Sequence, residues 1–204
     1  MITASVVTFH TSYVDLKRLL DCVLHSSIDI FFIIDNSSND SLREFASLSD
    51  KIVYIHSDNL GFGSGHNIAI RRSIELGAQY HAVINPDIYW EGDVAKPLAG
   101  FMDKQEDCGL VMPKVLYPNG NVQYLCKLLP TPMDLFGRRF IPFNAYQEKH
   151  DAWFELHHTG YDKVMEVPSL SGCFMFMRVE TLKQVGGFDE RFLCMPKTWI
   201  CVAG

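Results

Sequence analysis

Short β-branched runs alternate with longer amphipathic runs through the first half of the chain, and this alternation constrains the fold more than any other feature. The short runs predict strands at residues 4–8, 30–34, 51–56 and 81–84. The longer runs repeat apolar residues at helical spacing and predict helices at residues 14–23, 41–48 and 61–77. Repeated strand–helix–strand units predict right-handed crossovers, and therefore an α/β fold with a mostly parallel central sheet flanked by helices.

Polar residues gather at the end of each predicted strand. They lie at Thr8, 35–40, 59–67 and 85–87. Ligands of parallel sheets bind at the carboxyl ends of the strands. Four polar clusters in the expected place therefore predict a ligand site at this edge, more strongly than any single motif does.

Asp35 directly follows an apolar strand, so its carboxylate can accept hydrogen bonds from a base edge or a ribose hydroxyl. The segment Asp35-Asn36-Ser37-Ser38 is also good turn chemistry, and an Asx turn explains the residue without any ligand. Both interpretations stay open at this point.

Glycines recur between Gly61 and Gly65 at the start of a predicted helix, which indicates a phosphate cradle built from backbone N–H groups. A dinucleotide-binding loop would lie on the first strand–helix turn, but residues 9–12 contain no glycine. A plain flexible connector is the alternative. We expect His66 to be a packed or capping residue rather than a ligand contact.

Asn85-Pro86-Asp87 follows the fourth predicted strand. An acidic residue fixed there by a proline turn can hold a divalent cation, since Mg²⁺ typically takes one or two carboxylates together with substrate phosphates. The tripeptide also forms simple turns, so the metal interpretation depends on its position after Asp35 and the glycines.

The pattern changes after residue 109. Strands are expected at 111–115 and 122–124 around a turn at 118–120, and an irregular insertion at 128–163. Insertions of this length are usually functional or mobile. A further strand at 173–177 and a helix at 179–185 complete the expected elements.

Charge and cysteine spacing exclude several classes of protein. A net charge of −6 argues against a dedicated nucleic-acid binder. None of the six cysteines forms a CxxC pair, so we expect free thiols. With no leader-like start and no apolar run long enough for a bilayer, we expect a cytoplasmic protein. The stretch 128–139 is either a mobile lid or a peripheral contact with the inner face of the membrane.

Together these motifs resemble glycosyltransferase family 2, and within it the rhamnosyltransferase-like enzymes of bacterial polysaccharide synthesis. The matching segments are 6–9, 34–40, 59–63 with Asn67, 84–87, 113–114 with 119–120, 170–172 and 186–192. The resemblance implies a single GT-A domain over residues 1–204. Its Rossmann-like, nucleotide-sugar-binding half would span 1–108. Its acceptor half would span 109–204 and be incomplete at the C-terminus.

The resemblance also implies ligands and a reaction. The donor would be a dTDP- or UDP-linked sugar, the acceptor a saccharide or a lipid-linked saccharide, and the cofactor a divalent metal, Mg²⁺ or Mn²⁺. Transfer would proceed by direct displacement and invert the configuration at the anomeric carbon of the sugar. The metal would stabilise the departing nucleoside diphosphate, and a carboxylate would remove the proton of the acceptor hydroxyl.

The resemblance also implies roles for single residues. Thr8 and Asp35 would contact the nucleoside, and Asp87 would be the metal ligand. Ser171 and Gly172 would line the floor near the donor sugar, and the loop that closes over the nucleotide-sugar would include Asn59, Gly61, Phe62, Gly63 and Asn67. The first acid of the family's DxD-type motif is replaced by Asn85.

The chain departs from the family after Phe192. The family continues with Tyr-x-Glu-Asp-x-Asp-Leu, which includes the catalytic base, whereas no carboxylate follows Glu190 here. Codons permitted for residues 194–204, read one frame over, give Tyr-Ala-Glu-Asp-Leu-Asp-Leu-Cys-Arg-Arg. Codons of Met195, Pro196, Trp199 and Ile200 force the Ala and the second Asp. Our hypothesis is a frameshift that removed the base; a naturally divergent tail is the alternative.

Two other functions remain open. The chain could be a non-catalytic nucleotide-sugar-binding module. It could also be a nucleotidyltransferase, although such enzymes normally carry a glycine-rich first loop with Lys or Arg, which residues 9–13 lack.

Overall fold

A computed structural model describes residues 1–129, 131 and 144–191, with the side chains of 144–148 excluded. The chain divides into two compact units. The described part of the first unit comprises residues 1–113 and 172–191, and the second unit lies within residues 114–171. Each unit is described by itself.

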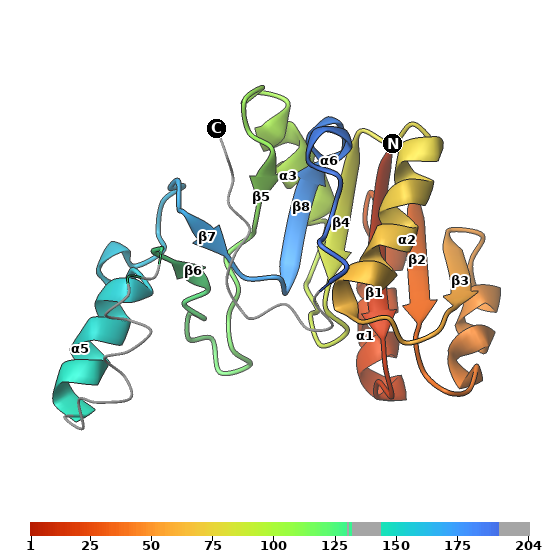
Figure 1. Cartoon of the computed structure of the whole chain (residues 1–204), viewed down its shortest axis with the longest axis horizontal. Coiled ribbons are helices and arrows are strands. Elements are labelled where there is room, and N and C mark those ends of the chain that lie inside the picture. Colours follow the sequence, from red (N-terminus) through yellow and green to blue (C-terminus); the bar gives the residue numbers. More distant parts are fainter. Residues whose placement is uncertain (130, 132–143, 192–204) are drawn as a thin grey trace. The chain divides into compact units, whose positions relative to one another are not determined.

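A six-stranded sheet forms the centre of the first unit, in the order β3-β2-β1-β4-β8-β5 (Figure 1). Its strands are β1 (Ile2–Thr8), β2 (Ile30–Asp35), β3 (Ile52–His56), β4 (Tyr80–Ile84), β5 (Leu110–Val111) and β8 (Phe174–Arg178). The first four pair in parallel, while β8 runs antiparallel to both β4 and β5. The expected α/β fold with a mostly parallel sheet is therefore confirmed.

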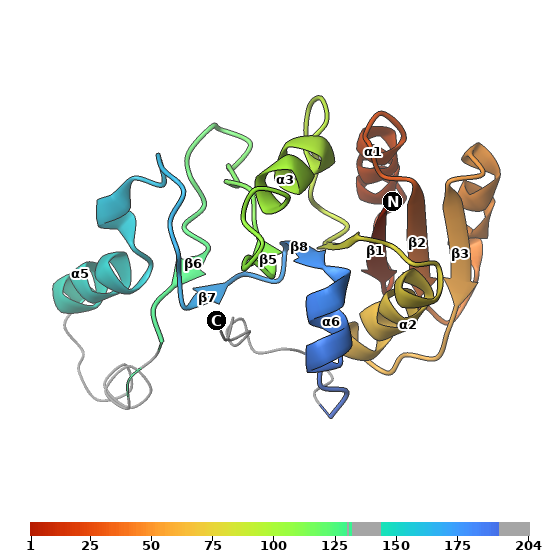
Figure 2. The ribbon, with the colours of Figure 1, turned by 90° about the horizontal axis from the view of Figure 1, so that it is seen from above.

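Helices cover both faces of this sheet (Figure 2). They are α1 (Tyr13–Leu24), α2 (Phe62–Glu75), α3 (Ala95–Met102) and α6 (Val179–Val185), with the 3-10 helix η1 (Ser41–Leu48) beside β3. Figure 2 shows α1 and α3 on one face and α2 and α6 on the other. Phe31 and Ile33 face the α1 side while Phe32 and Ile34 pack on the α2 side. Burial of both faces explains why the strands are apolar without alternation.

Helix η1 has its expected bounds. Its N-cap residue, Asp40, makes no side-chain cap hydrogen bond, and the Asn39 side chain accepts the Ser41 N–H at 3.2 Å. No helix was predicted for the residues that form α3. Pro97 lies in the first turn, where a missing N–H breaks no helical bond. Asp93 accepts the N–H groups of Ala95 and Lys96 at 3.1 and 3.2 Å.

The second unit begins with a hairpin rather than the two strands expected at 111–115 and 122–124. Its arms pair through the isolated bridge of Leu116 with Val122 and through the Gln123 N–H, which donates to Val115 C=O at 2.9 Å, but they form no strand. The strand prediction is therefore wrong except at Val111, which lies in β5. The turn itself is confirmed: Gly120 N–H donates to Tyr117 C=O at 2.8 Å, and Gly120 has φ +84°. Pro-Asn-Gly is suited to such a turn because glycine takes the left-handed conformation without a steric cost.

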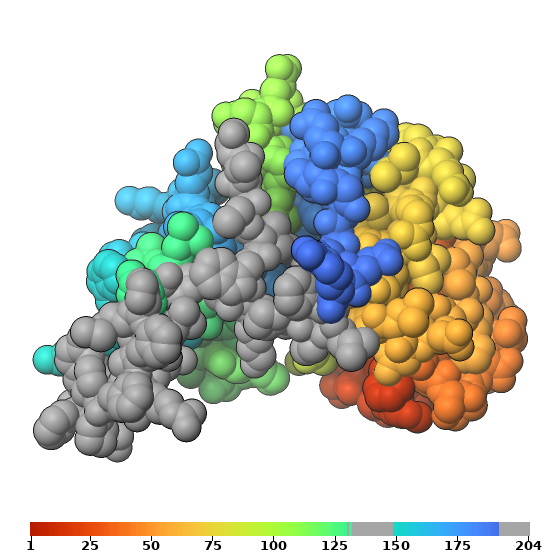
Figure 3. All heavy atoms as spheres, in the orientation of Figure 1, coloured from red at the N-terminus to blue at the C-terminus, as the bar shows by residue number. Residues whose placement is uncertain are grey.

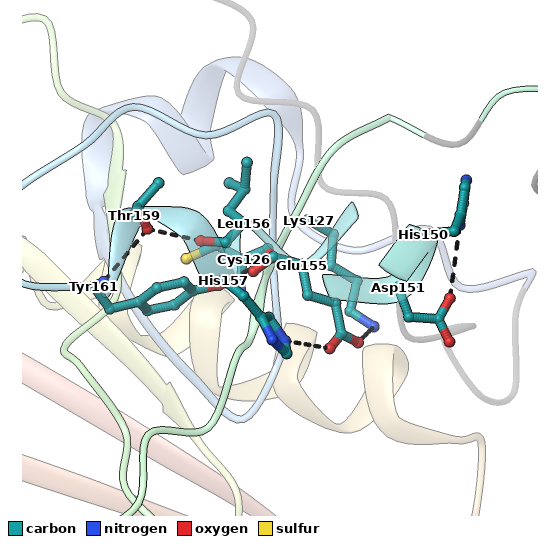
Figure 4. Close-up of polar contacts among 9 residues, drawn as sticks. All are labelled: Cys126, Lys127, His150, Asp151, Glu155, Leu156, His157, Thr159 and Tyr161. Carbon is teal, nitrogen blue, oxygen red and sulfur yellow. Dashed lines mark hydrogen bonds and ion pairs between the residues drawn. The ribbon is translucent and has the colours of Figure 1, made fainter. Parts of the chain in front are cut away.

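A two-stranded sheet, β6 (Cys126–Lys127) with β7 (Ser169–Leu170), lies beside α5 (Asn144–Phe154) and η2 (His157–Thr159) in the second unit. The expectation of an irregular insertion at 128–163 is wrong for these helices. Tyr161 connects β6 to the residue that follows α5 (Figure 4). Its hydroxyl accepts the Cys126 N–H at 2.8 Å and donates to the Glu155 carbonyl at 3.0 Å. Among the described residues, no helix is long and apolar enough to cross a membrane.

Cys22 and Cys126 are free thiols, as expected. Cys194 and Cys201 lie outside the described residues, as do most of 128–139.

Candidate functional site

The predicted site residues of the first unit lie along one edge of its sheet. Because β1, β2 and β4 are parallel, the segments that follow Thr8, Asp35 and Ile84 leave the sheet at the same edge. Helix α2 follows β3 and therefore also begins at that edge, as Figure 1 shows. This is the edge at which parallel sheets bind ligands.

Asp35 is fully buried, and three donors hold its carboxylate. Thr8 Oγ1 and the Ser37 N–H donate to Oδ1 at 2.9 and 3.1 Å, and the Tyr54 hydroxyl donates to Oδ2 at 2.8 Å. Burial alone would raise the pKa of Asp35, but these hydrogen bonds more than offset it, so the pKa lies below its ordinary value. The Ser37 bond is the predicted Asx turn. The predicted nucleoside contact of Thr8 and Asp35 stays a prediction.

Tyr54 is a component of this cluster that sequence reasoning missed. It lies in the middle of β3, and burial together with Asp35 raises its pKa. The Arg43 guanidinium lies over its ring at 5.1 Å and pairs with Asp40 at 2.9 Å. Nothing in the sequence around position 54 distinguishes this tyrosine from any other aromatic residue in a strand.

The glycines of residues 61–65 lie at a helix start rather than in a flexible connector, so the connector interpretation is wrong. Gly61 precedes α2 with φ +92°, and the first helical bond runs from Gly65 N–H to Gly61 C=O at 3.1 Å. The N–H groups of Phe62, Gly63 and Ser64 precede that bond and have no helical acceptor. They form the kind of amide cluster that attracts anions.

Close packing is a second reason for glycine in this helix. A Cβ at Gly65 would lie 2.7 Å from Val7 Cγ2, and one at Gly63 would lie 3.0 Å from Phe188 Cβ. Both distances are too short for an ordinary contact. Glycine therefore lets α2 approach β1 on one side and Phe188 on the other.

Asn67 was predicted to belong to a donor-binding loop, but its side chain contacts a distant part of the chain. Its amide donates to Phe188 C=O at 2.8 Å and to Glu190 Oε1 at 2.9 Å, and its Oδ1 accepts the Phe188 N–H at 2.9 Å. The residue is buried, and both amide hydrogens are engaged. The Asn59 side chain accepts the Gly61 N–H at 3.2 Å.

His66 is a packed histidine, as expected, and it ends a buried chain of hydrogen bonds between α2 and the sheet. Its Nδ1 lies 2.8 Å from Ser5 Oγ, which lies 2.9 Å from His81 Nε2. His81 Nδ1 lies 2.8 Å from Ser73 Oγ and 2.9 Å from Thr3 Oγ1. Burial lowers the pKa of His66 well below its ordinary value and that of His81 to about 3, so both rings are neutral.

Asp87 is exposed beyond β4, and its carboxylate makes no hydrogen bond or ion pair to the described residues. The turn before it is fixed, because the Ile88 N–H donates to Asn85 C=O at 3.2 Å and the Asn85 N–H to Cys173 C=O at 2.9 Å. No group of three metal-binding side chains occurs among the residues that the structure describes. A single free carboxylate fits a cation that takes most of its other ligands from phosphates and water.

Ser171 and Gly172 lie at the boundary between the two units. Ser171 N–H donates to Leu125 C=O at 3.1 Å within the second unit. Gly172 belongs to the first unit, where a Cβ would lie 4.0 Å from Phe62 Cζ, so two predicted donor residues are neighbours. The tail after Phe192, where the catalytic base was sought, lies outside the described residues.

Comparisons of the sequence place this geometry in a family. The sequence pattern described as "Glycosyl transferase family 2" matches residues 5–186, which is most of the chain. A curated protein of Haloferax volcanii, "Low-salt glycan biosynthesis hexosyltransferase Agl10", is 36% identical over 85 residues. That alignment covers 41% of this chain and 27% of the relative.

Two solved structures share the fold. "Crystal structure of S. aureus TarS" matches with a TM-score of 0.62 at 14% identity, over 96% of this chain and 32% of that one. "Mannosyltransferase PcManGT from Pyrobaculum calidifontis in complex with GDP-Man and Mn2+" matches with a TM-score of 0.56 at 15% identity. It covers 93% of this chain and 47% of that one. The chain thus spans less than half the length of each of these proteins, and its own fold is GT-A.

Proposed function

The chain belongs to glycosyl transferase family 2, and from that premise we propose that it binds a nucleotide-diphosphate sugar and transfers the sugar to a saccharide or lipid-linked acceptor. One observation carries the proposal. Three features lie at the carboxyl edge of the parallel strands: the hydrogen-bonded carboxylate of Asp35, the start of α2 and the unpaired carboxylate of Asp87. Nucleoside, diphosphate and metal would occupy these three places in turn.

The nucleoside end of the donor would lie beside Asp35. Its three donors keep the carboxylate charged and fixed: Thr8 and Ser37 fill both acceptor positions of Oδ1, and Tyr54 fills one of Oδ2, so Oδ2 retains one acceptor position for a base or ribose donor. Thr8 would act with it, as the resemblance implies. A dTDP- or UDP-linked sugar is the proposed donor, and rhamnose its proposed sugar.

The diphosphate end would lie between α2 and Asp87. The start of α2 offers the N–H groups of Phe62, Gly63 and Ser64 to phosphate oxygens. Asp87 would hold a divalent metal, Mg²⁺ or Mn²⁺, whose role when bound is to stabilise the departing diphosphate. The match to a mannosyltransferase solved with GDP-Man and Mn²⁺ supports this assignment by analogy.

The proposed transfer inverts the configuration at the anomeric carbon, because the acceptor hydroxyl attacks from the side opposite to the departing nucleoside diphosphate. A carboxylate must take the acceptor proton, and the residues that follow Phe192 offer none. We therefore retain the frameshift hypothesis, under which this chain binds its donor but turns over poorly. Sequencing the encoding DNA decides it: an intact frame without an alternative Glu-Asp-x-Asp reading would end the hypothesis.

A place in bacterial polysaccharide synthesis, in the cytoplasm or at the inner face of the membrane, is part of the proposal. Lipid-linked acceptors would bring the protein to that surface. Flotation with vesicles that carry a lipid-linked saccharide tests this; protein that stays at the bottom of the gradient contradicts the membrane contact.

A turnover assay separates the candidate functions. Radiolabelled UDP- and dTDP-sugars are incubated with the chain, Mn²⁺ and saccharide acceptors, and transferred sugar is counted. Transfer that Asp87→Asn abolishes, and that Asp50→Asn on the opposite edge leaves intact, supports the enzyme. Donor binding without transfer indicates a binding module if the encoding DNA has an intact frame, and an enzyme that has lost its base if the DNA carries the frameshift. Formation of a nucleotide-sugar from a nucleoside triphosphate and a sugar phosphate would instead indicate a nucleotidyltransferase.

A further inference from the structure

Three hydrogen bonds join Asn67 in α2 to a segment more than a hundred residues later. We call the side chain of Asn67, the backbone of Phe188 and the carboxylate of Glu190 the clasp. Its distances are 2.8 Å to Phe188 C=O, 2.9 Å from Phe188 N–H and 2.9 Å to Glu190 Oε1. Arg71, one turn further along α2 than Asn67, forms an exposed ion pair with Glu190 at 3.2 Å. Figure 3 shows the blue atoms of this segment packed against the orange and yellow atoms of α2.

Gly187 allows the clasp to close. Its φ of +82° is one that residues with a side chain rarely adopt, and a Cβ there would lie 2.6 Å from Asn67 Oδ1. Any other residue at 187 would therefore push the segment away from Asn67. The clasp thus depends on both of its sides, and each side can be altered separately.

The clasp holds an aromatic ring against the first turn of α2. The Phe188 ring centroid lies 5.9 Å from that of Phe62 and 6.0 Å from that of His66, and Phe62 and His66 are 4.4 Å apart. Phe188 is buried, and it lies where a Cβ on Gly63 would intrude. The turn whose N–H groups lack helical acceptors is therefore fixed from the side by Phe188 as well as from below by β1.

We propose that Asn67 is a positioning residue for donor binding. It holds Phe188 on the first turn of α2, and so fixes the amide end of that helix for the diphosphate. It also fixes the segment that leads directly into the position of the family's catalytic base. This inference rests on the proposed function, because it assumes that the diphosphate binds at the start of α2. By linkage, donor binding would in turn tighten the clasp.

Calorimetry with UDP- and dTDP-sugars in the presence of Mn²⁺ tests the proposal. Asn67→Ala removes the clasp from the helix side, and Gly187→Ala opens it from the other side while keeping Asn67. Both variants are expected to weaken the donor at least about tenfold, or about 1.4 kcal/mol. Arg71→Gln, which removes only an exposed ion pair, is expected to change the affinity less than about twofold.

A matched variant separates positioning from general stability. Val23→Ala destabilises the unit from α1, on the opposite face of the sheet, and should lower the melting temperature without changing donor affinity. Hydrogen exchange of the 61–66 amides, measured without ligand, should be faster in Asn67→Ala and Gly187→Ala than in Val23→Ala. This readout remains usable if a variant binds too weakly for calorimetry.

Three results decide the matter. Weak donor binding and fast 61–66 exchange in both clasp variants support the proposal. Wild-type affinity in the clasp variants overturns it and leaves the proposed function intact. A wild-type chain that binds neither nucleotide-sugar with Mn²⁺ contradicts the proposed function itself, and the inference with it.

Discussion

Acidification from pH 7.5 to pH 5 should destabilise the first unit through its two buried histidines. His81 lies in β4 and is fully buried against β1 and α2, and burial lowers its pKa from 6.5 to about 3. The ring stays neutral in the folded chain at pH 5, whereas the unfolded chain protonates it. A histidine with a depressed folded pKa stabilises the fold above pH 6.5, and this contribution is lost as the pH falls from 6.5 towards 3.

The magnitude follows from linkage. At pH 5 the unfolded ring is almost fully protonated and the folded ring is not, so one proton is bound on unfolding. The free energy of unfolding therefore falls by about 2 kcal/mol between pH 7.5 and pH 5 from His81 alone. His66 shifts in the same direction, through burial and through His81, and adds to the loss. Carboxylates contribute little in this window because their unfolded pKa values lie near 4.

Urea unfolding at the two pH values, followed by pulse-labelling hydrogen exchange of β1 and β4 peptides, measures the effect in the unit that holds both rings. His81→Asn should lose about 2 kcal/mol of the pH dependence, whatever its stability at pH 7.5. Val23→Ala, which removes no titratable group, should lower the stability at both pH values and leave the pH dependence unchanged. Equal stability of the wild-type chain at the two pH values would refute the reasoning.

Further predictions concern the packing and polar contacts of each unit. Gly65→Ala should lower stability by about 1–3 kcal/mol in urea unfolding, because its Cβ would meet Val7 at 2.7 Å; full stability would show that α2 can shift. Tyr54→Phe removes one hydrogen bond from the buried Asp35 and should cost about 1.5–3 kcal/mol. The same variant should raise the pKa of Asp35, measured by carboxyl NMR titration, and an unchanged titration would contradict the role given to Tyr54. Tyr161→Phe should release the contacts to Cys126 and Glu155 and speed exchange of the Cys126 amide, with exchange in β1 unaffected.

Much of the first unit could be predicted from the sequence because its strands and helices are specified locally. The helix at 179–185 has its predicted bounds, and β2 differs by a single residue. Strand prediction failed at 112–115 and 122–124, where β-branched residues flank a hairpin whose arms pair through one bridge and a few further hydrogen bonds. Such pairing depends on tertiary contacts, which local propensity does not contain.

The candidate site was predictable as a place but not as a set of contacts. Topology puts Asp35 and Asp87 at one edge, and sequence order alone was sufficient for that. The partners of Asp35 and Asn67 were not predictable, because Tyr54 and Phe188 meet them only after the chain has folded. The glycines show the same limit: Gly65 looks like part of a phosphate loop, yet it also lets α2 approach Val7.

We propose that the carboxyl edge of this sheet binds a nucleotide-diphosphate sugar with a divalent metal. Calorimetric titration of the wild-type chain with UDP- and dTDP-sugars, with and without Mn²⁺, measures this binding. At least one nucleotide-sugar is expected to bind, Mn²⁺ is expected to tighten binding, and Asp87→Asn is expected to remove the effect of the metal. Absence of binding by both nucleotides in the presence of Mn²⁺ would contradict the proposal.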